Sequence, residues 1–327
     1  MVKWGIIGPG AIANAFAKEV NNSQGGKVIA VFGRNEERAK NFSEKYNIEK
    51  YYSDINKFLN DDNIDAVYIA TPHNYHMEYA IKCIKAKKHI LCEKPFSYNY
   101  KTSKEVLDLA KENNVFIMEA LWTLFLPAIN KAKTWVKENK IGKVKLITAN
   151  FGFKSEEDVN SRLYNANLAG GALLDVGIYP ILFSNFIMND IPKEIKASAT
   201  MTRTGVDETD VINLRYKDGA LASLTCSIAA ETDNTAVIYG EKGKIVIPTF
   251  WMAKEAYLYS YENEEKFEDK FEDKYNEAGY KYEIIEANNC IVNNALESDI
   301  ASHDVTLCLA RIMDEIREQI GLVYPFE

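Results

Sequence analysis

The sequence predicts an α/β protein, in which a doubly wound parallel sheet of the Rossmann type is followed by an α+β domain with a large open, mostly antiparallel sheet. In the first third of the chain, short apolar runs alternate with segments of helical periodicity, which indicates βαβ units. These runs are almost continuously apolar, as strands are when helices cover both faces of the sheet. After about residue 123, strand-like segments follow one another with glycine-containing turns between them, which favours antiparallel pairing.

The elements expected in the first domain, residues 1–122, alternate regularly. Asn35 is expected to be the N-cap of the second helix, and Ser53 or Asp54 that of the third, because short polar side chains satisfy the free N–H groups of a helix start. The expected strands span 3–8, 27–33, 48–53, 64–70, 88–94 and 115–120, and the expected helices span 11–22, 35–47, 53–61, 74–87 and 97–114.

The second domain, residues 123–327, is expected to begin with a helix over 126–140 and to end with a long helix over 298–321. Gly321 is a suitable C-cap for the last helix, which by sequence order could return to pack on the first domain. The charge-rich duplication at 266–275 is expected to be a solvated hairpin or loop, with an interaction site as the alternative. The expected strand segments span 144–153, 194–203, 210–230, 234–248 and 255–262.

Composition and charge exclude several classes of protein. A length of 327 residues suits two domains, and the net charge of −8 offers no basic surface for nucleic acid. We find no apolar run approaching the roughly 18 residues that span a membrane, and no secretory signal pattern at the start. The five scattered cysteines suit reduced thiols. We therefore expect a cytoplasmic protein with neither nucleic acid nor membrane as a partner.

A glycine-rich turn lies between the first strand and the first helix, over Gly8-Pro9-Gly10-Ala11-Ile12-Ala13. In this position Gly8 permits a tight turn, Gly10 lets the backbone approach a pyrophosphate, and Ala13 allows close packing of helix on strand. The bland alternative is a βα turn that binds no ligand. The parallel-sheet context favours a dinucleotide site.

The end of the second strand predicts which dinucleotide is bound. An NAD site usually has a carboxylate there, but this chain has Gly33-Arg34-Asn35, with Arg38 one turn further on. An arginine can stack on adenine and pair with a 2′-phosphate, so NADP is expected and NAD is less favoured. The alternative is that both arginines are ordinary surface residues, and the neighbouring acidic pair at 36–37 weakens the positive field.

Two further stretches carry candidate catalytic residues. Glu93 and Lys94 follow a predicted strand at the edge of the sheet where ligands bind, and Pro95 fixes the turn and is a residue type that can follow a cis bond. Asp175 and Tyr179 are four residues apart, so on a helix they share one face. A phenol beside Lys94 could exchange the proton of a substrate hydroxyl while hydride moves to or from carbon. The alternative for Tyr179 is a core tyrosine with a bonded hydroxyl.

These motifs together resemble the Gfo/Idh/MocA family of oxidoreductases, and within it the branch of dimeric dihydrodiol dehydrogenases and NADP-dependent D-xylose dehydrogenases. The resemblance rests on GIIGPGAIA, TPHNYH, HILCEKPF, MEALWT, GGALLDVGIYP and IREQIGLVYPFE, and it runs through the whole chain. It implies a Rossmann domain, an open-sheet domain used for substrate binding and often for dimerisation, and hydride transfer to or from a sugar or vicinal diol.

The resemblance also implies roles for individual residues. Lys94 corresponds to the catalytic lysine, Tyr179 to the proton donor of this branch, and Asp175 to an aspartate that orients substrate and lysine. Trp122 and Phe153 are candidates for substrate contact, with core packing as the alternative. Leu124 stands where the branch usually has arginine, which puts the substrate in doubt. The expected cofactor contacts are Gly8, Gly10, Ala11, Ile12, Gly33, Arg34, Arg38, Thr71, Pro72, Asn74, His76, Glu93 and Lys94.

Other possibilities remain at this point. Some members of the family are cofactor-binding regulators without activity, and some are glycoside hydrolases that recycle a bound NAD. His73 and His76 could suggest a metal pair, but a credible site needs three or four ligands, so no metal is expected. The expected partner is a small sugar or diol, and the expected assembly is a homodimer or a higher homo-oligomer.

Overall fold

The computed structural model describes residues 1–20, 22–23, 25–261 and 264–327. The chain forms two compact units, and the first ends at Trp122. Unit 1 comprises Met1–Trp122 and Gly279–Leu307, and unit 2 comprises Thr123–Ala278 and Cys308–Glu327. The second unit therefore is not the continuous stretch 123–327, because residues 279–307 return to the first.

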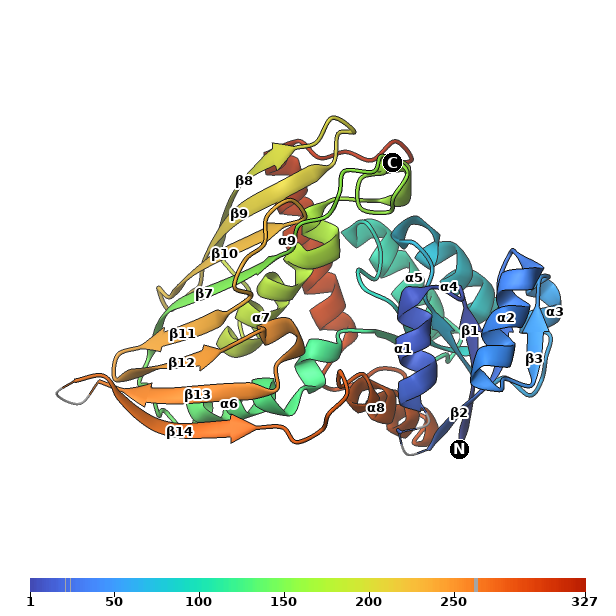
Figure 1. Cartoon of the computed structure of the whole chain (residues 1–327), viewed down its shortest axis with the longest axis horizontal. Coiled ribbons are helices and arrows are strands. Elements are labelled where there is room, and N and C mark those ends of the chain that lie inside the picture. The colour runs from blue at the N-terminus through green and yellow to red at the C-terminus, as the bar shows by residue number, and fades with distance from the viewer. Residues whose placement is uncertain (21, 24, 262–263) are drawn as a thin grey trace. The chain divides into compact units, whose positions relative to one another are not determined.

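Unit 1 is built on a six-stranded, wholly parallel sheet in the order β3-β2-β1-β4-β5-β6 (Figure 1). This is the doubly wound order, and it confirms the predicted fold. The strands are β1 (Val2–Ile7), β2 (Gly26–Phe32), β3 (Lys50–Tyr52), β4 (Ala66–Ile69), β5 (His89–Cys92) and β6 (Ile117–Glu119). The helices that follow them are α1 (Ala11–Val20), α2 (Glu36–Tyr46), α3 (Ile55–Leu59), α4 (His76–Lys85) and α5 (Tyr100–Glu112).

The helix boundaries follow capping chemistry. Asn35 caps α2 by accepting the Arg38 N–H at 2.9 Å, and Asp54 rather than Ser53 caps α3. The helix expected over 11–22 ends at Val20, and position 21 lies outside the described residues.

One helix of unit 1 was not predicted. Helix α8 (Lys281–Val292) packs on α1, β1 and β2, and the Trp4 indole N–H donates to Asn288 Oδ1 at 2.9 Å. Its sequence mixes polar and apolar residues and has only a weak apolar stripe. Tertiary packing, more than local periodicity, therefore defines this helix.

Unit 2 is built on an eight-stranded sheet in the order β14-β13-β12-β11-β7-β10-β9-β8. All neighbours pair antiparallel except β7 and β10, which are parallel, so the sheet is mostly antiparallel as predicted. The strands are β7 (Val144–Gly152), β8 (Glu194–Met201), β9 (Asp207–Arg215), β10 (Leu221–Ser227), β11 (Ala236–Gly240), β12 (Gly243–Ile247), β13 (Glu255–Ser260) and β14 (Lys266–Glu272).

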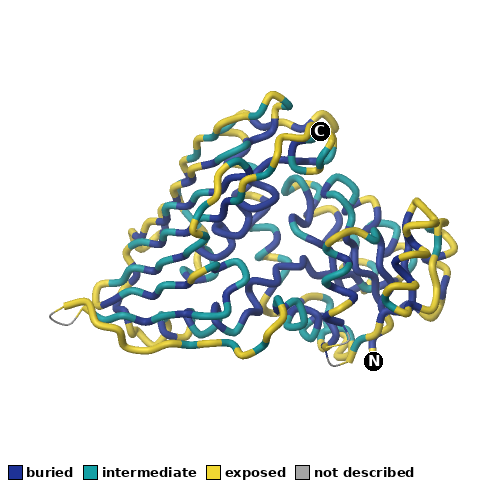
Figure 2. Tube along the Cα trace, viewed as in Figure 1, coloured by how far each residue is buried: buried dark blue, intermediate teal, exposed yellow. Residues whose placement is uncertain are grey.

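Helices α6 (Pro127–Lys137) and α7 (Ile178–Met188) cover one face of this sheet (Figure 1). The segment expected to be a hairpin or loop at 266–275 forms the edge strand β14, which pairs with β13 and is exposed along its length (Figure 2). Its alternating charges suit an unprotected sheet edge, where charged side chains discourage further pairing. The strand expected over 255–262 ends at Ser260, and position 262 lies outside the described residues.

The last helix, α9 (His303–Ile320), begins five residues later than expected. Ser298 Oγ accepts the N–H groups of Ile300 and Ala301, so this stretch forms a capped turn instead. Gly321 ends the helix with φ of +72°, and the Leu322 N–H bonds back to the Arg317 carbonyl, which confirms the predicted C-cap. Helix α9 is divided between the units after Leu307.

One helical stretch, Ala166–Met188, has the length and apolar composition of a membrane span, contrary to the expectation that no such run exists. The most apolar 18-residue window is 83% buried inside the protein, as in the core helix of a globular fold.

Candidate active site

The glycine turn lies at the carboxyl edge of the parallel sheet, between β1 and α1. Gly8 has φ of +92°, and a Cβ on it would lie 2.9 Å from the Ala70 carbonyl oxygen at the end of β4. Gly10, in contrast, has its nearest neighbour among the described residues, the Ala70 carbonyl oxygen, 4.0 Å from its Cβ position. It leaves room for a ligand at the start of α1, where helix N–H groups attract phosphate. The strand order reverses between β1 and β4, which is where open α/β sheets bind ligands.

Two buried polar atoms beside this turn fit a dinucleotide. Thr71 Oγ1 follows β4, and Asn74 Oδ1 lies in the short 3-10 turn η1 (His73–Tyr75), which begins after Pro72. Both atoms are buried and meet no hydrogen-bond partner in the described part of the chain. A buried polar group without a partner is costly, so these two atoms suit the hydroxyl and phosphate groups of a ligand. The methyl group of Thr71 lies 3.1 Å from the Cβ position of Gly8.

The end of β2 presents arginine where NAD sites usually have a carboxylate. Gly33 packs against Pro9, and the exposed Arg34 places its guanidinium carbon 4.9 Å from the centre of the Tyr75 ring. Arg38 is exposed in the first turn of α2. The Asn35 side chain is engaged in capping α2. The strand end is therefore basic and aromatic, which is compatible with a phosphorylated ribose.

Buried side chains hold the backbone around Lys94, which follows β5. The peptide bond between Lys94 and Pro95 is cis. Glu93 accepts the Lys94 N–H at 3.3 Å with one carboxylate oxygen and the Tyr68 hydroxyl with the other. Glu119, at the end of β6, accepts the Phe96 N–H at 2.7 Å. The loop that presents Lys94 is thus fixed from inside the protein, which preorganises a catalytic group.

His76 joins the two loops of the site. Its Nδ1 lies 2.9 Å from the Pro95 carbonyl oxygen, and its Nε2 lies 2.9 Å from that of Thr71. The side chain is fully buried, and burial lowers the pKa of the imidazole. A neutral imidazole carries one N–H, so His76 donates to one of these carbonyl oxygens and packs against the other, which places it between the two loops.

In unit 2, Asp175 and Tyr179 lie on one continuous helical segment, whose boundaries were not predicted from the sequence. Asp175 belongs to the π-helical turn η4 (Leu173–Gly177), and Tyr179 lies in α7, which follows directly. Both are buried, with 4% and 8% of their surface exposed. Arg162 donates to both Asp175 oxygens, at 2.5 and 3.4 Å, from a loop. This ion pair orients the Asp175 carboxyl group.

An aromatic cluster surrounds Tyr179. Phe151 meets the Tyr179 ring edge-on at 5.3 Å, and Trp251 stacks on Phe151 at 4.6 Å. Phe153 is half-buried at the edge of this cluster, 6.5 Å from Phe151 between ring centres.

Trp122, in unit 1, is 3% exposed and stacks on Tyr280 at 4.3 Å. Leu124 is 1% exposed, so it packs as a core residue.

The sequence pointed to most of these residues but missed several, including Glu119 and Tyr68 beside the Lys94 loop. Arg162 lies in an irregular loop without a motif, Tyr280 precedes the unpredicted helix α8, and Asp207 accepts the Leu173 N–H at 2.5 Å from the start of β9. Asp207 precedes the strand expected from residue 210, and no motif in the sequence marks it.

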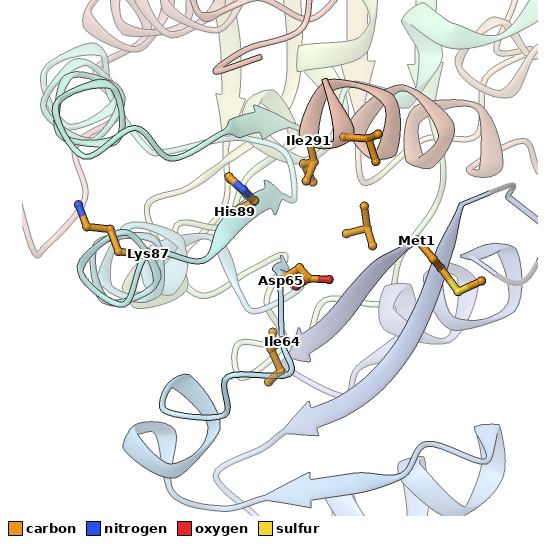
Figure 3. A pocket seen from close by; sticks show the side chains of 8 residues that line it. Met1, Ile64, Asp65, Lys87, His89 and Ile291 are labelled. Atoms are coloured by element: carbon orange, nitrogen blue, oxygen red, sulfur yellow. The ribbon is translucent and has the colours of Figure 1, made fainter. Parts of the chain in front are cut away.

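A cavity of about 330 Å³ lies elsewhere in unit 1 (Figure 3). Met1, Ile64, Asp65 and His89 line it together with residues of α8. These residues start the strands whose far ends carry the glycine turn and Lys94, so this cavity is at the opposite edge of the sheet from the candidate site.

Comparisons with known proteins agree with this arrangement. Residues 2–121 match the family described as "Oxidoreductase family, NAD-binding Rossmann fold" of the Gfo/Idh/MocA group, and residues 129–246 match the GFO/IDH/MocA C-terminal domain. The structure is similar to that of a 3-ketoreductase from Actinomadura kijaniata in complex with NADP and TDP-benzene, with a TM-score of 0.88, 22% identity and 98% of each chain covered. This structural likeness supports the fold.

Curated relatives cover almost the whole chain. A trans-1,2-dihydrobenzene-1,2-diol dehydrogenase of Danio rerio is 35% identical over 99% of this chain and 98% of its own length. The scyllo-inositol 2-dehydrogenase (NADP(+)) of Bacillus subtilis is 33% identical over 99% of both chains. The resemblance seen in the sequence is thereby confirmed: this chain belongs to the Gfo/Idh/MocA family of oxidoreductases.

Proposed function

We propose that this protein is an NADP-dependent oxidoreductase that transfers hydride between the nicotinamide and a hydroxyl-bearing or carbonyl carbon of a sugar or vicinal diol. The observation that carries the proposal is the Lys94 loop, which three buried side chains hold at the same sheet edge as the open turn at Gly10. The names of the relatives support the same reaction class, since they are dehydrogenases of a diol and of an inositol.

The basic end of β2 supports NADP over NAD. Arg34 would face the adenine and the 2′-phosphate, with Arg38 adding a second positive charge. The remaining contacts are the Gly8–Ile12 turn for the pyrophosphate, and Gly33, Thr71, Pro72 and Asn74 for the nucleoside portions. Glu93 and Lys94 would lie on the nicotinamide side, and His76 would act by holding the loops.

The catalytic roles divide between proton transfer and positioning. When bound, NADP accepts the hydride from the carbon, and NADPH returns it in the reverse direction. Tyr179 takes the proton of the substrate hydroxyl during oxidation and gives it back to the carbonyl oxygen during reduction. Lys94 holds that oxygen, and Asp175, paired with Arg162, orients the substrate hydroxyl groups. Phe153 and Trp122 would contact the carbon skeleton of the substrate.

The test uses Lys94→Ala and Tyr179→Phe, with Lys101→Ala and Tyr51→Phe as exposed controls of the same residue types. Both site variants should lose turnover by about 1,000-fold while their Kd for NADP stays within roughly threefold of the wild type. The two controls should retain activity. Near-normal turnover of either site variant would overturn the assignment.

We also propose that the protein works in the cytoplasm as a homodimer or higher homo-oligomer. The five cysteines are free thiols, which suits a reducing compartment. Val211 and Leu221 are 42% and 49% exposed on neighbouring strands β9 and β10, which offers apolar surface for a second copy. Light scattering of the purified protein tests the oligomeric state, and a monomer at micromolar concentration would refute the proposed oligomer.

A further inference from the structure

We propose that Asp207 and Asp210 share a single proton and act as positioning residues for the helical segment that carries Asp175 and Tyr179. Their effect on turnover rests on the proposed function, whereas the shared proton can be tested without it. Both aspartates belong to β9 and both are fully buried.

Asp207 caps the start of the helical segment. Its Oδ2 accepts the Leu173 N–H at 2.5 Å. Leu173 opens the π-helical turn, and the helix then continues without interruption through α7. A carboxylate at this end satisfies free N–H groups and interacts favourably with the helix dipole. Asp175 lies two residues beyond the capped position.

The approach of Asp207 depends on the preceding glycines. Gly171 has φ of +118°, and a Cβ on it would lie only 2.0 Å from Asp207 Oδ1. Gly170 is held in turn by the Tyr324 hydroxyl, which donates to its carbonyl oxygen at 2.8 Å. The turn before the catalytic segment is therefore fixed on both sides, by a carboxyl group and by a tyrosine.

Asp210 holds a proton that removes the repulsion between its own carboxyl group and that of Asp207. Its carboxyl group lies against that of Asp207, and both Oδ1 atoms are buried without an N–H or O–H partner in the described chain. Two carboxylates in contact in a buried site cannot both be ionised. Burial and the neighbouring Asp207 raise the pKa of Asp210 to about 9. The pair is thus one carboxylic acid and one carboxylate near neutral pH.

The groups packed against the pair are neutral. The Cys226 thiol of β10 donates to Asp210 Oδ2 at 3.2 Å, and burial raises its pKa. The Tyr324 phenol lies near both carboxyl groups, and burial raises its pKa as well. Cys226 also touches the end of the catalytic turn, since a Cβ on Gly177 would lie 2.8 Å from its sulfur atom. Neither group offers a positive charge to a second carboxylate.

Three variants separate the shared proton from the cap. In Asp210→Asn the amide donates to Asp207 as the shared proton does, so kcat at pH 7 should stay within about twofold of wild type. Asp207→Ala removes the cap and should lower kcat roughly tenfold or more, with the Kd for NADP unchanged because the cofactor residues are in unit 1. Asp207→Asn keeps an acceptor for Leu173 and should restore most of the lost kcat. Asp218→Asn, in an exposed turn, is the neutral control.

The pH dependence of Tm tests the proton directly. The folded protein holds on Asp210 a proton that the unfolded chain has released above about pH 4, so this stabilisation is present at low pH and is lost as pH rises toward 9. Between pH 5 and 9, wild-type Tm should fall by on the order of 5 °C more than that of Asp210→Asn.

The shared proton and the positioning role are each tested separately from the proposed reaction. Parallel Tm curves for wild type and Asp210→Asn would overturn the shared proton, and wild-type kcat in a folded Asp207→Ala would overturn the positioning role. If Asp207→Ala does not fold, the comparison of Tm between wild type and Asp210→Asn still decides whether the two aspartates share a proton. If the wild type binds NADP but turns over no sugar or diol, the proposed function fails while the Tm comparison still stands.

Discussion

Arg34 is the residue on which cofactor choice is expected to depend. Its guanidinium is stacked 4.9 Å from the Tyr75 ring, at the end of a strand without a carboxylate. Arg34→Ala should raise the Kd for NADP by about 10- to 100-fold, the value of a charge-assisted phosphate contact, and leave the Kd for NAD within about threefold. Titration of both cofactors measures this. Equal weakening of both, or an effect of the same size in the exposed Arg203→Ala control, would contradict the assignment.

His76 should matter for a different reason, because it clamps the Thr71 and Pro95 loops from a fully buried position. His76→Ala should lower the free energy of unfolding by about 2 kcal/mol and reduce kcat, since the Lys94 loop loses a support. His89→Ala is the matched control at the opposite sheet edge, where His89 accepts the Phe116 N–H at 3.0 Å. The control should lose stability but keep kcat. Urea denaturation and turnover distinguish the two, and an equal loss of kcat in both would refute the clamp.

At the scale of elements, two glycines with positive φ make a direct comparison. Gly171 precedes the catalytic turn and has no room for a Cβ, whereas Gly219, in the turn between β9 and β10, has no atom of the described residues within 4 Å of its Cβ position. Gly219→Ala should cost about 1 kcal/mol from backbone strain alone. Gly171→Ala should cost about 3 kcal/mol, because strain and the clash with Asp207 add. Equal costs in urea denaturation would show that the contact with Asp207 is unimportant.

The elements that could be predicted are those whose local signals agree with their packing. The parallel strands other than the edge strand β3 are mainly apolar, buried runs, and Asn35, Asp54 and Gly321 act through capping chemistry that is local in sequence. Helix α8 and the π-helical turn η4 depend on contacts with distant segments, so periodicity does not reveal them. The strand β14 is charged and exposed, and pairing with β13 is what orders it.

The residues of the candidate site also fall into two groups, those with a local signal in the sequence and those without one. The glycine turn and Lys94 were found because a strand end fixes where each lies. Arg162 and Asp207 act on the helical segment from 13 and 34 residues away, through loop and strand positions with no motif. Such partners become visible only in three dimensions.

At the scale of the whole molecule, stability should depend on the pH near neutrality. Burial raises the pKa of Glu119 to about 7, with Phe96 and Thr306 donating to its two oxygens. Because this pKa lies above the unfolded value, the stabilisation is present below about pH 4.5 and is lost as pH rises through 7. Glu119→Gln should remove about 3 kcal/mol of the fall in unfolding free energy between pH 4.5 and 8. An unchanged pH profile in this variant would contradict the prediction.

The measurement that tests the central claim most directly is NADPH absorbance during incubation of the purified protein with NADP and a panel of inositols, pentoses, hexoses and vicinal diols. The same panel with NAD, and with Tyr179→Phe, serves as the control. We predict that NADPH appears with at least one polyol, that NAD is a poorer substrate, and that the variant is inactive. NADP binding without turnover on any hydroxyl or carbonyl compound would contradict the proposed function.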